Sequence, residues 1–143
     1  MSPTPSGFQV GAVMTKNPVT VDVHAPLSDA SRLMDVHDCR HLAVTESDTL
    51  VGILSSRDIL LAANAANKEK QDITVGDAYI AYPYHAASTD PLVKALDSMM
   101  GLHISSTLVV DNGKLVGILT TYDVCRVLRD LLEDDSSEET EIV

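Results

Sequence analysis

The sequence has no tryptophan, and only one phenylalanine and four tyrosines occur among its 143 residues. A folded core must therefore be built from aliphatic side chains, and the hydrophobic content of 45% is enough to supply one. No hydrophobic run approaches the roughly 20 residues that cross a membrane. The opening "MSPTPSGFQV" also lacks the basic and apolar regions of a secretion signal. We therefore expect a cytoplasmic protein with no membrane partner.

Cysteine is scarce as well, since Cys39 and Cys125 are the only two. Neither belongs to a set of ligands with the spacing of a zinc site, so we expect two buried, reduced thiols and no bound metal. The sequence also lacks a Ser–His–Asp set, a glycine-rich phosphate loop and a pair of catalytic acids. We therefore predict a protein that is not an enzyme and needs no catalytic cofactor.

Basic residues are few, because 10 Lys and Arg stand against 21 Asp and Glu, for a net charge of −11. Six of the acids lie in "EDDSSEETEIV" at 133–143, which contains no basic residue. The rest of the chain has 15 acidic and 10 basic residues and a net charge of −5. We predict that 133–143 is a disordered acidic tail. The negative body argues against nucleic-acid binding.

The sequence repeats itself at a shift of 65 residues, without a gap. "LVGIL" occurs at 50–54 and again at 115–119, and further identities precede it in order: Val10-Gly11 with Val75-Gly76, Pro18 with Pro83, Pro26-Leu27 with Pro91-Leu92, Ala30 with Ala95, Met34 with Met99, and Val44 with Val109. Such an ordered series indicates an internal duplication. We divide the chain into an N-terminal tail (1–9), repeat 1 (10–66), a polar linker (67–72), repeat 2 (73–132) and the acidic tail (133–143).

Each repeat has the same pattern of predicted elements. A helical turn and a short strand are followed by a helix at 26–37 or 91–102, a pair of strands at 41–45 and 49–54 or at 107–111 and 114–119, and a last helix at 56–66 or 121–132. The order βαββα, found twice, predicts an α+β fold. A half of this size buries little by itself. We therefore expect the two three-stranded sheets to pack on each other as a pseudo-twofold pair.

A sequence motif shared by the repeats, Gly-x-x-(Ser/Thr)-x-x-Asp, lies where a strand leads into the last helix. It comprises Gly52, Ser55 and Asp58 in the first copy and Gly117, Thr120 and Asp123 in the second. A glycine allows another backbone or a ligand to come close. The spacing Ser/Thr-x-x-Asp resembles a capping box, and the free N–H groups of the first turn also suit an oxygen-rich ligand. Capping and ligand binding are both open, and one residue can serve in both.

Further stretches of the first repeat carry a family resemblance: "VMTKNPVTV" at 13–21, "PLSDASRLM" at 26–34, "HLAV" at 41–44 and "LVGILSSRDIL" at 50–60. With "GIL(S/T)xxD" in both copies, they resemble a tandem cystathionine-β-synthase (CBS) domain pair over residues 9–132. The resemblance implies a stand-alone regulatory module that binds an adenosine-containing ligand, most of all AMP, ADP or ATP, in the cleft between the repeats. It also implies a homodimer that reports energy state to an unidentified client protein.

The resemblance also implies roles for individual residues. It gives ribose binding to Ser55, Asp58, Thr120 and Asp123, and phosphate binding to Arg40, His41 and Arg57. Ser105, Ser106 and Tyr122 take the aligned positions in the second copy, so positive charge is confined to the first. We favour the Thr120–Asp123 site as the better phosphate holder. Candidates for lining the adenine are Val19, Thr20, Ile53 and Ile118, although such side chains belong to a core by default.

A second function stays open, namely a ligand-free module that serves only to dimerise or to bind a partner. The segment "DVCRVLRDLL" at 123–132 favours it, because its apolar residues could form a helix–helix interface: Val124, Val127, Leu128, Leu131 and Leu132.

Overall fold

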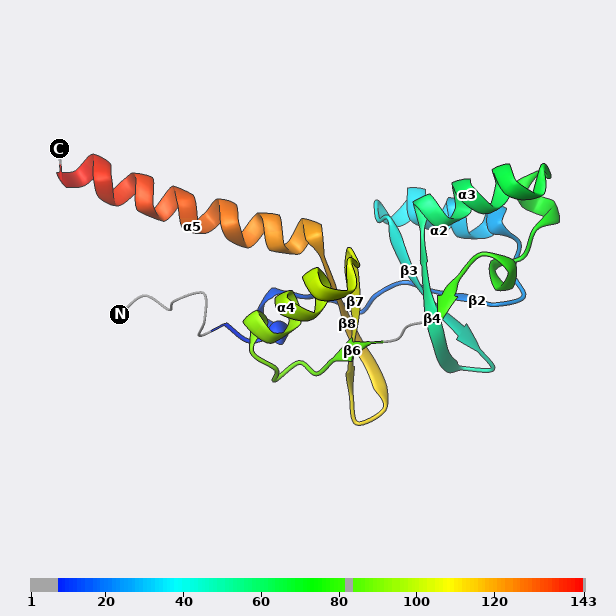
Figure 1. Ribbon diagram of the computed structural model, residues 1–143, viewed down its shortest axis with the longest axis horizontal. Helices are drawn as coiled ribbons and strands as arrows, with labels where there is room; N and C mark the ends of the chain where they lie inside the picture. Colours follow the sequence, from blue (N-terminus) through cyan, green and yellow to red (C-terminus); the bar gives the residue numbers. More distant parts are fainter. Residues whose placement is uncertain (1–7, 82–83, 143) are drawn as a thin grey trace. The chain divides into compact units, whose positions relative to one another are not determined.

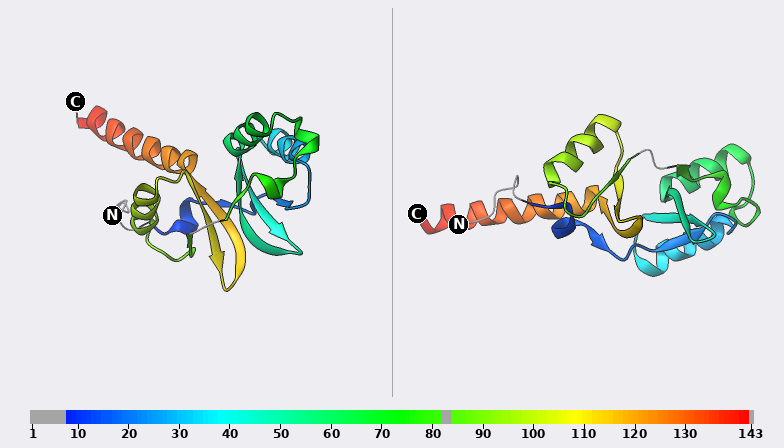
Figure 2. Two further views of the ribbon diagram at one scale, coloured as in Figure 1. Left: turned by 45° about the vertical axis from the view of Figure 1, so that its right-hand side comes forward. Right: turned by 90° about the horizontal axis from the view of Figure 1, so that it is seen from below.

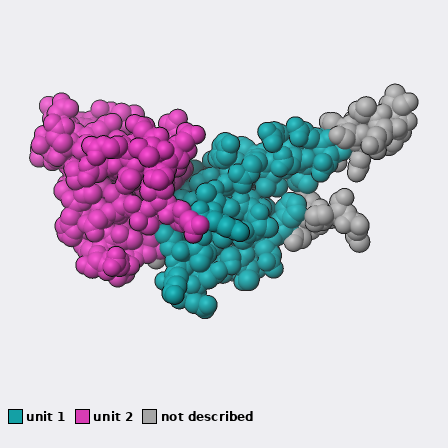
Figure 3. Space-filling view, turned by 180° about the vertical axis from the view of Figure 1, so that it is seen from behind, with its two compact units in different colours: residues 1–16, 85–143 teal, residues 17–84 magenta. Residues whose placement is uncertain are grey.

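The computed structural model describes residues 8–81 and 84–142, with side chains described as far as Asp134. The chain forms two compact units (Figures 1 and 3). Unit 1 comprises Met1–Lys16 with His85–Val143, and unit 2 comprises Asn17–Tyr84. Each unit combines one mixed sheet with helices, so the predicted α+β class is confirmed. The packing of one sheet on the other stays a prediction.

Unit 2 contains a four-stranded sheet in the order β2-β3-β4-β5. The strands are β2 (Thr20–Asp22), β3 (His41–Glu46), β4 (Thr49–Ser55) and β5 (Ile80–Ala81), and only the pair β2–β3 is parallel. The helices are α2 (Leu27–His37) and α3 (Ser56–Ala66), followed by two 3-10 turns, η2 (Lys70–Asp72) and η3 (Val75–Asp77). The helices and central strands agree with the predicted ranges within one or two residues, because their apolar periodicity is strong.

The core of unit 2 lies between one face of its sheet and the two helices (Figure 2). Leu27, Ala30 and Met34 lie on one face of α2, as the helical spacing predicts. They pack with Ile59 of α3 and with alternate residues of the strands, Val21, Leu42, Val44 and Leu54. Leu27, Leu42 and Leu54 are completely buried, and each contributes about 2 kcal/mol through the apolar surface removed from water.

Unit 1 contains the corresponding sheet in the order β1-β8-β7-β6. Its strands are β1 (Thr15–Lys16), β8 (Lys114–Thr120), β7 (Ser106–Asp111) and β6 (His85–Ala86), and its helices are α1 (Val10–Val13), α4 (Leu92–Leu102) and α5 (Thr121–Ile142). α5 continues past the predicted end at Leu132 into the acidic segment for which disorder was predicted. No glycine or proline interrupts residues 121–142, so the sequence has no strong helix-stop signal there.

The fourth strand of each sheet comes from the other repeat. β1, at the start of repeat 1, pairs with β8, and β5, at the start of repeat 2, pairs with β4. The expectation of three-stranded sheets was therefore wrong. Equivalent backbone hydrogen bonds of 2.8–2.9 Å hold the exchanged segments: Val10 and Gly11 donate to Asp90 and Ser88, and Val75 and Gly76 donate to Ala25 and Val23. Each compact unit thus needs residues from both repeats.

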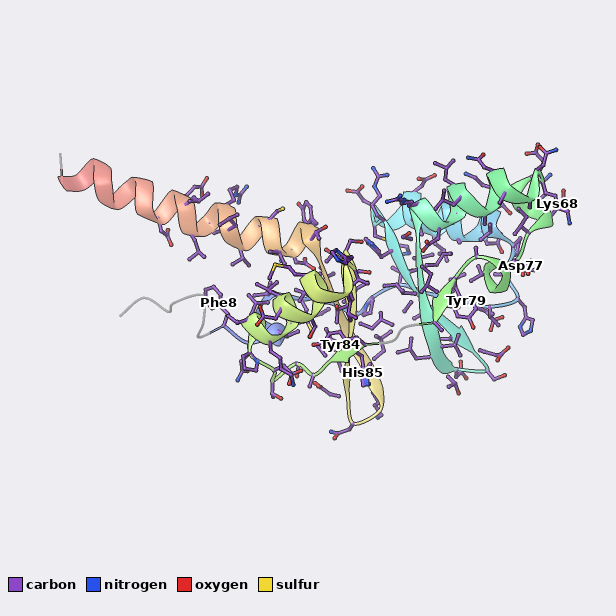
Figure 4. All side chains as sticks on the ribbon, in the orientation of Figure 1. Phe8, Lys68, Asp77, Tyr79, Tyr84 and His85 are labelled. Atoms are coloured by element: carbon purple, nitrogen blue, oxygen red, sulfur yellow. The ribbon has the colours of Figure 1, made fainter. Side chains whose placement is uncertain are left out.

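Gly52 and Gly117 allow the exchanged strands to approach. A Cβ atom at Gly52 would collide with the carbonyl oxygen of Ile80 and would lie 2.6 Å from Cδ2 of Tyr79 (Figure 4). A Cβ atom at Gly117 would collide with the sulfur of Met14 and lie 3.0 Å from the carbonyl oxygen of Thr15. Of the two neighbours that the sequence left open, backbone or ligand, the structure places protein beside both glycines.

The cysteines differ from their predicted burial. Cys39 is partly buried, whereas Cys125 is exposed on α5. The expectation of two buried thiols was wrong for Cys125, because it lies on the side of the helix turned to solvent. In the part of the chain that the structure describes, no helix is both long enough and apolar enough to span a membrane.

We predict that Gly52→Ala lowers the free energy of unfolding by about 1–3 kcal/mol, because β5 must move away from β4. The matched control is Gly101→Ala in α4, where an added Cβ atom meets nothing within 4 Å. This control should gain about 0.5–1 kcal/mol, since alanine is the better helix former. Urea unfolding measures both changes. A neutral Gly52→Ala variant would contradict the close packing of β5.

Candidate functional site

In unit 2, the shared motif forms a complete capping box. Ser55 ends β4 and is the N-cap residue of α3. The backbone N–H of Ser55 donates to Oδ2 of Asp58 at 2.8 Å, and the N–H of Asp58 donates to Oγ of Ser55 at 3.1 Å. These two bonds satisfy groups that a helix start otherwise leaves unpaired. The capping role is therefore confirmed for this copy, and the Asp58 side chain remains partly exposed.

In unit 1, more hydrogen bonds hold the aspartate carboxylate of the same motif. Oδ2 of Asp123 accepts from the N–H of Thr120 at 2.9 Å and from its hydroxyl at 3.1 Å. The N–H of Asp123 donates back to the Thr120 hydroxyl at 3.4 Å. The Asp123 side chain is completely buried. A buried carboxylate has to be matched by donors, and the capping contacts supply only part of them.

The other donors to Asp123 are two residues that sequence reasoning missed. The hydroxyl of Thr15, in the exchanged strand β1, donates to Oδ1 of Asp123 at 2.9 Å. Nη2 of Arg126, one turn further along α5, lies 3.4 Å from the same oxygen and also donates to the carbonyl oxygen of Val13 at 3.2 Å. Asp123 and Arg126 together therefore fasten the segment α1–β1 to the start of α5.

Several predicted site residues share one face of the unit 2 sheet. A row of directly opposite residues crosses its four strands, namely Thr20, Ala43, Ile53 and Ile80. His41, on the same strand as Ala43, is opposite Ser55. Opposite residues on neighbouring strands point to the same face, and residues alternate between faces along a strand. Thr20, His41, Ile53 and Ser55 therefore lie on the face that does not pack against α2 and α3.

His41 is a titratable residue of this face, and its surroundings shift its pKa. Burial lowers the pKa of the imidazole, because the charged form is desolvated, and the negative charge of Asp58 acts in the opposite direction. The neutral ring is thus favoured in the folded protein, although Asp58 or an anionic ligand nearby would favour the charged ring.

The two predicted phosphate-binding arginines lie elsewhere in unit 2. Arg40 and Arg57 line a groove of about 630 Å³ between α2 and α3, together with Ser56 and Lys70, which sequence reasoning did not select. The lining does not include His41, Ser55 or Asp58. The structure thus gathers the arginines but does not place them with His41 in one cluster.

Other predicted residues belong mainly to the protein's interior. Val19 is partly buried against the core of unit 2. Ile118 of β8 is 6% exposed and lies opposite Thr15 on one side and Leu108 on the other. These positions fit the default role of aliphatic residues. Among the described residues, no group of three or more His, Cys, Asp or Glu side chains is placed to hold a metal ion.

The comparison with protein families decides the origin of this architecture. The model of the CBS domain matches the chain twice, over residues 10–65 and 75–130. The chain belongs to the CBS domain family. The two matches correspond to the duplicated halves of the sequence, and the predicted resemblance is confirmed.

Similar proteins include solved CBS domain pairs and a larger enzyme. The chain is 27% identical to the CBS domain pair of protein MJ0100, solved with 5′-methylthioadenosine and S-adenosyl-L-methionine, with a TM-score of 0.76 over 85% of this chain and 96% of that one. It is also 27% identical to CBSX2, solved with AMP, with a TM-score of 0.73 over 87% and 98% of the two chains. Among curated relatives, homoserine O-acetyltransferase of Methanococcoides burtonii is 31% identical over 121 residues, which make up 83% of this chain but only 24% of that enzyme.

We predict that the equivalent carboxylates of the two CBS repeats differ in their effect on stability. Asp123→Ala should lower the free energy of unfolding by about 3 kcal/mol, because it leaves buried donors and Arg126 without their acceptor. Asp58→Ala should cost only about 1 kcal/mol, the usual loss for a helix cap. Urea unfolding without nucleotide measures both. Equal costs would show that Thr15 and Arg126 add nothing to the Asp123 site.

A second prediction concerns pH. Since the folded-state pKa of His41 is lowered, the unfolded chain binds this proton more readily. The contribution of His41 to stability is therefore present above its unfolded pKa of about 6.5 and is lost as the pH falls from there towards the folded-state pKa. Replacing the ring by His41→Gln should reduce the loss of stability between about pH 7.5 and 5.5. An unchanged loss, measured by urea unfolding at each pH, would contradict this role.

Proposed function

We propose that this CBS pair is a regulatory module whose ligand contains adenosine, with AMP, ADP and ATP as the first candidates. The observation that carries the proposal is the partly exposed carboxylate of Asp58, which the capping box of α3 holds at the start of the helix. An ionised carboxylate can accept hydrogen bonds from both hydroxyls of a ribose. The structures of MJ0100 with 5′-methylthioadenosine and S-adenosyl-L-methionine and of CBSX2 with AMP support the same ligand class.

The neighbours of Asp58 suit the other parts of such a ligand. Ser55 and His41 lie next to each other on the same sheet face, and Thr20 and Ile53 offer partly apolar surface in the adjoining row. We propose that this surface contacts the adenine, while His41 and the positive charges of the exposed Arg40 and Arg57 attract the phosphate. Local cations matter here, because the chain as a whole carries a net charge of −11 and repels an anion at long range.

The output of the module would be a change in how it associates with itself or with a client protein. A ligand shifts such an equilibrium only by its different affinity for the two states. We propose a cytoplasmic homodimer that reports the level of adenine nucleotides and performs no catalysis. The match to homoserine O-acetyltransferase, which involves about a quarter of that enzyme, leaves room for CBS repeats as one part of a larger protein.

A ligand-free interaction module remains the second candidate, because the helices of unit 2 expose apolar side chains. Val36 of α2 and Leu60 and Leu61 of α3 are 71%, 58% and 54% exposed. On α5, Val124, Val127 and Leu131 are partly buried, but Leu128 and Leu132 are exposed. A module of this kind would dimerise through such side chains whether or not nucleotide is present.

Titration calorimetry with AMP, ADP, ATP, NADH and S-adenosyl-L-methionine tests the proposal on the full chain. We expect saturable binding of at least one of them, and Asp58→Ala should weaken it by about tenfold or more through the loss of charge-assisted hydrogen bonds. Light scattering on the same samples would follow the mass. The ligand-free module would be favoured if none of the five compounds binds and the measured mass is that of a dimer with or without them.

A further inference from the structure

The two family-equivalent carboxylates are not equally available to a ligand. The side chain of Asp123 is completely buried, Oδ1 accepts from Thr15 and lies beside Arg126, and Oδ2 accepts from the backbone and hydroxyl of Thr120. Asp58 is partly exposed, and its hydrogen bond from the Ser55 N–H uses Oδ2. The described residues place no hydrogen bond on Oδ1 of Asp58. A diol can therefore reach one carboxylate without displacing protein groups, but not the other.

Two differences between the repeats produce this asymmetry. Thr15 lies opposite Ile118, and Ile80 lies opposite Ile53, so Thr15 and Ile80 occupy equivalent places in the two sheets. Ile80 has no polar side-chain atom and leaves the Asp58 carboxylate without a hydroxyl partner. The position equivalent to Arg126, 65 residues earlier, is Leu61, which is 54% exposed and carries no charge. A threonine and an arginine thus close one site, and an isoleucine and a leucine leave the other open.

We propose that Asp58 binds the ribose of the first ligand, and that Thr15 and Arg126 keep Asp123 as an internal strut. This inference rests on the proposed function and assigns its first binding event to one carboxylate. It reverses the preference for the Thr120–Asp123 site that charge and resemblance alone suggested. A second ligand binds at Asp123 only by displacing the Thr15 hydroxyl and the Arg126 guanidinium, so it binds more weakly. Because Arg126 also holds the carbonyl oxygen of Val13, the second event loosens α1–β1.

The first test compares AMP with 2′,3′-dideoxy-AMP, which lacks both ribose hydroxyls, by calorimetry on the full chain. We expect one AMP per chain at the higher affinity, and a loss of about tenfold or more for the dideoxy compound. In Asp58→Ala the two compounds should bind equally, because the acceptor of the diol is gone. Asp123→Asn should preserve the preference for AMP in whatever folded fraction it retains.

The second test exchanges the residues that differ between the repeats. Ile80→Thr supplies Asp58 with the hydroxyl that Asp123 receives from Thr15, so the preference for AMP over the dideoxy compound should shrink. Thr15→Val removes that hydroxyl from Asp123 with little change in shape, so a second AMP should bind more tightly than in the wild type. Both are β-branched replacements suited to a strand, and the thermal midpoint of each shows whether it folds.

The outcomes separate this inference from the function on which it rests. If the wild type binds none of the adenosyl ligands, the proposed function itself is overturned. If it binds AMP but the preference for the ribose hydroxyls survives Asp58→Ala, the assignment to Asp58 is wrong. Two equal AMP sites per wild-type chain, or a Thr15→Val variant with an unchanged second event, would overturn the role of Thr15 in closing Asp123.

Discussion

The reciprocal exchange of short strands is the constraint on which the rest of this structure depends. β1 completes the sheet of unit 1 and β5 completes that of unit 2, and each is only two residues long. Such short strands gain little from their own ladder bonds, so the neighbouring contacts have to hold them. Backbone hydrogen bonds from Val10 and Val75, and the space left by Gly52 and Gly117, supply those contacts. Packing alone thus explains the glycine of the shared motif, before any ligand is considered.

The aspartate of the same motif has two uses. In both repeats it caps the helix that follows the second long strand, and this alone would favour an aspartate at that position. What a capping carboxylate does beyond that depends on the groups facing its free oxygen. Asp58, for which Ile80 takes the place equivalent to Thr15, stays partly exposed, whereas Asp123, beside Thr15 and Arg126, becomes part of the interior. Duplication produced two copies of the same motif. Single residue differences in the strand and the helix that face each copy gave the two aspartates different roles.

Much of the fold could be predicted because its signals are local. The spacing of Leu27, Ala30 and Met34 places one face of α2 in the core, and Ser55 with Asp58 predicts the start of α3 to the residue. The fourth strands could not be predicted, because two residues carry no periodicity and their partners are distant in sequence. Thr15 pairs with Ile118, and no local pattern contains that register.

The candidate site was predicted unevenly for the same reason. The repeat predicts Asp58 and Asp123 as equivalent site residues. It does not predict their unequal burial, because the sequences that flank them are nearly the same. The alignment of Thr15 with Ile80 was available in the sequence, and only the exchange of strands gives it meaning. The arginines were selected for their charge, yet long exposed side chains take their positions from the helices around them. Arg40 and Arg57 therefore line the groove between α2 and α3, and His41 does not belong to that lining.

The pairing of Thr15 with Ile118 also governs the order in which the chain can mature during synthesis. When the ribosome has released only the first repeat, that repeat still lacks β5, and its own opening residues have no sheet to join. The first half must therefore wait for the start of the second, and α1 with β1 must wait for nearly the whole chain. Until then β4 is an unpaired sheet edge at Gly52 and Ile53, the residues that β5 later covers, and such an edge favours wrong pairing. Chains that stall after the first repeat are thus the ones that would be most exposed to aggregation.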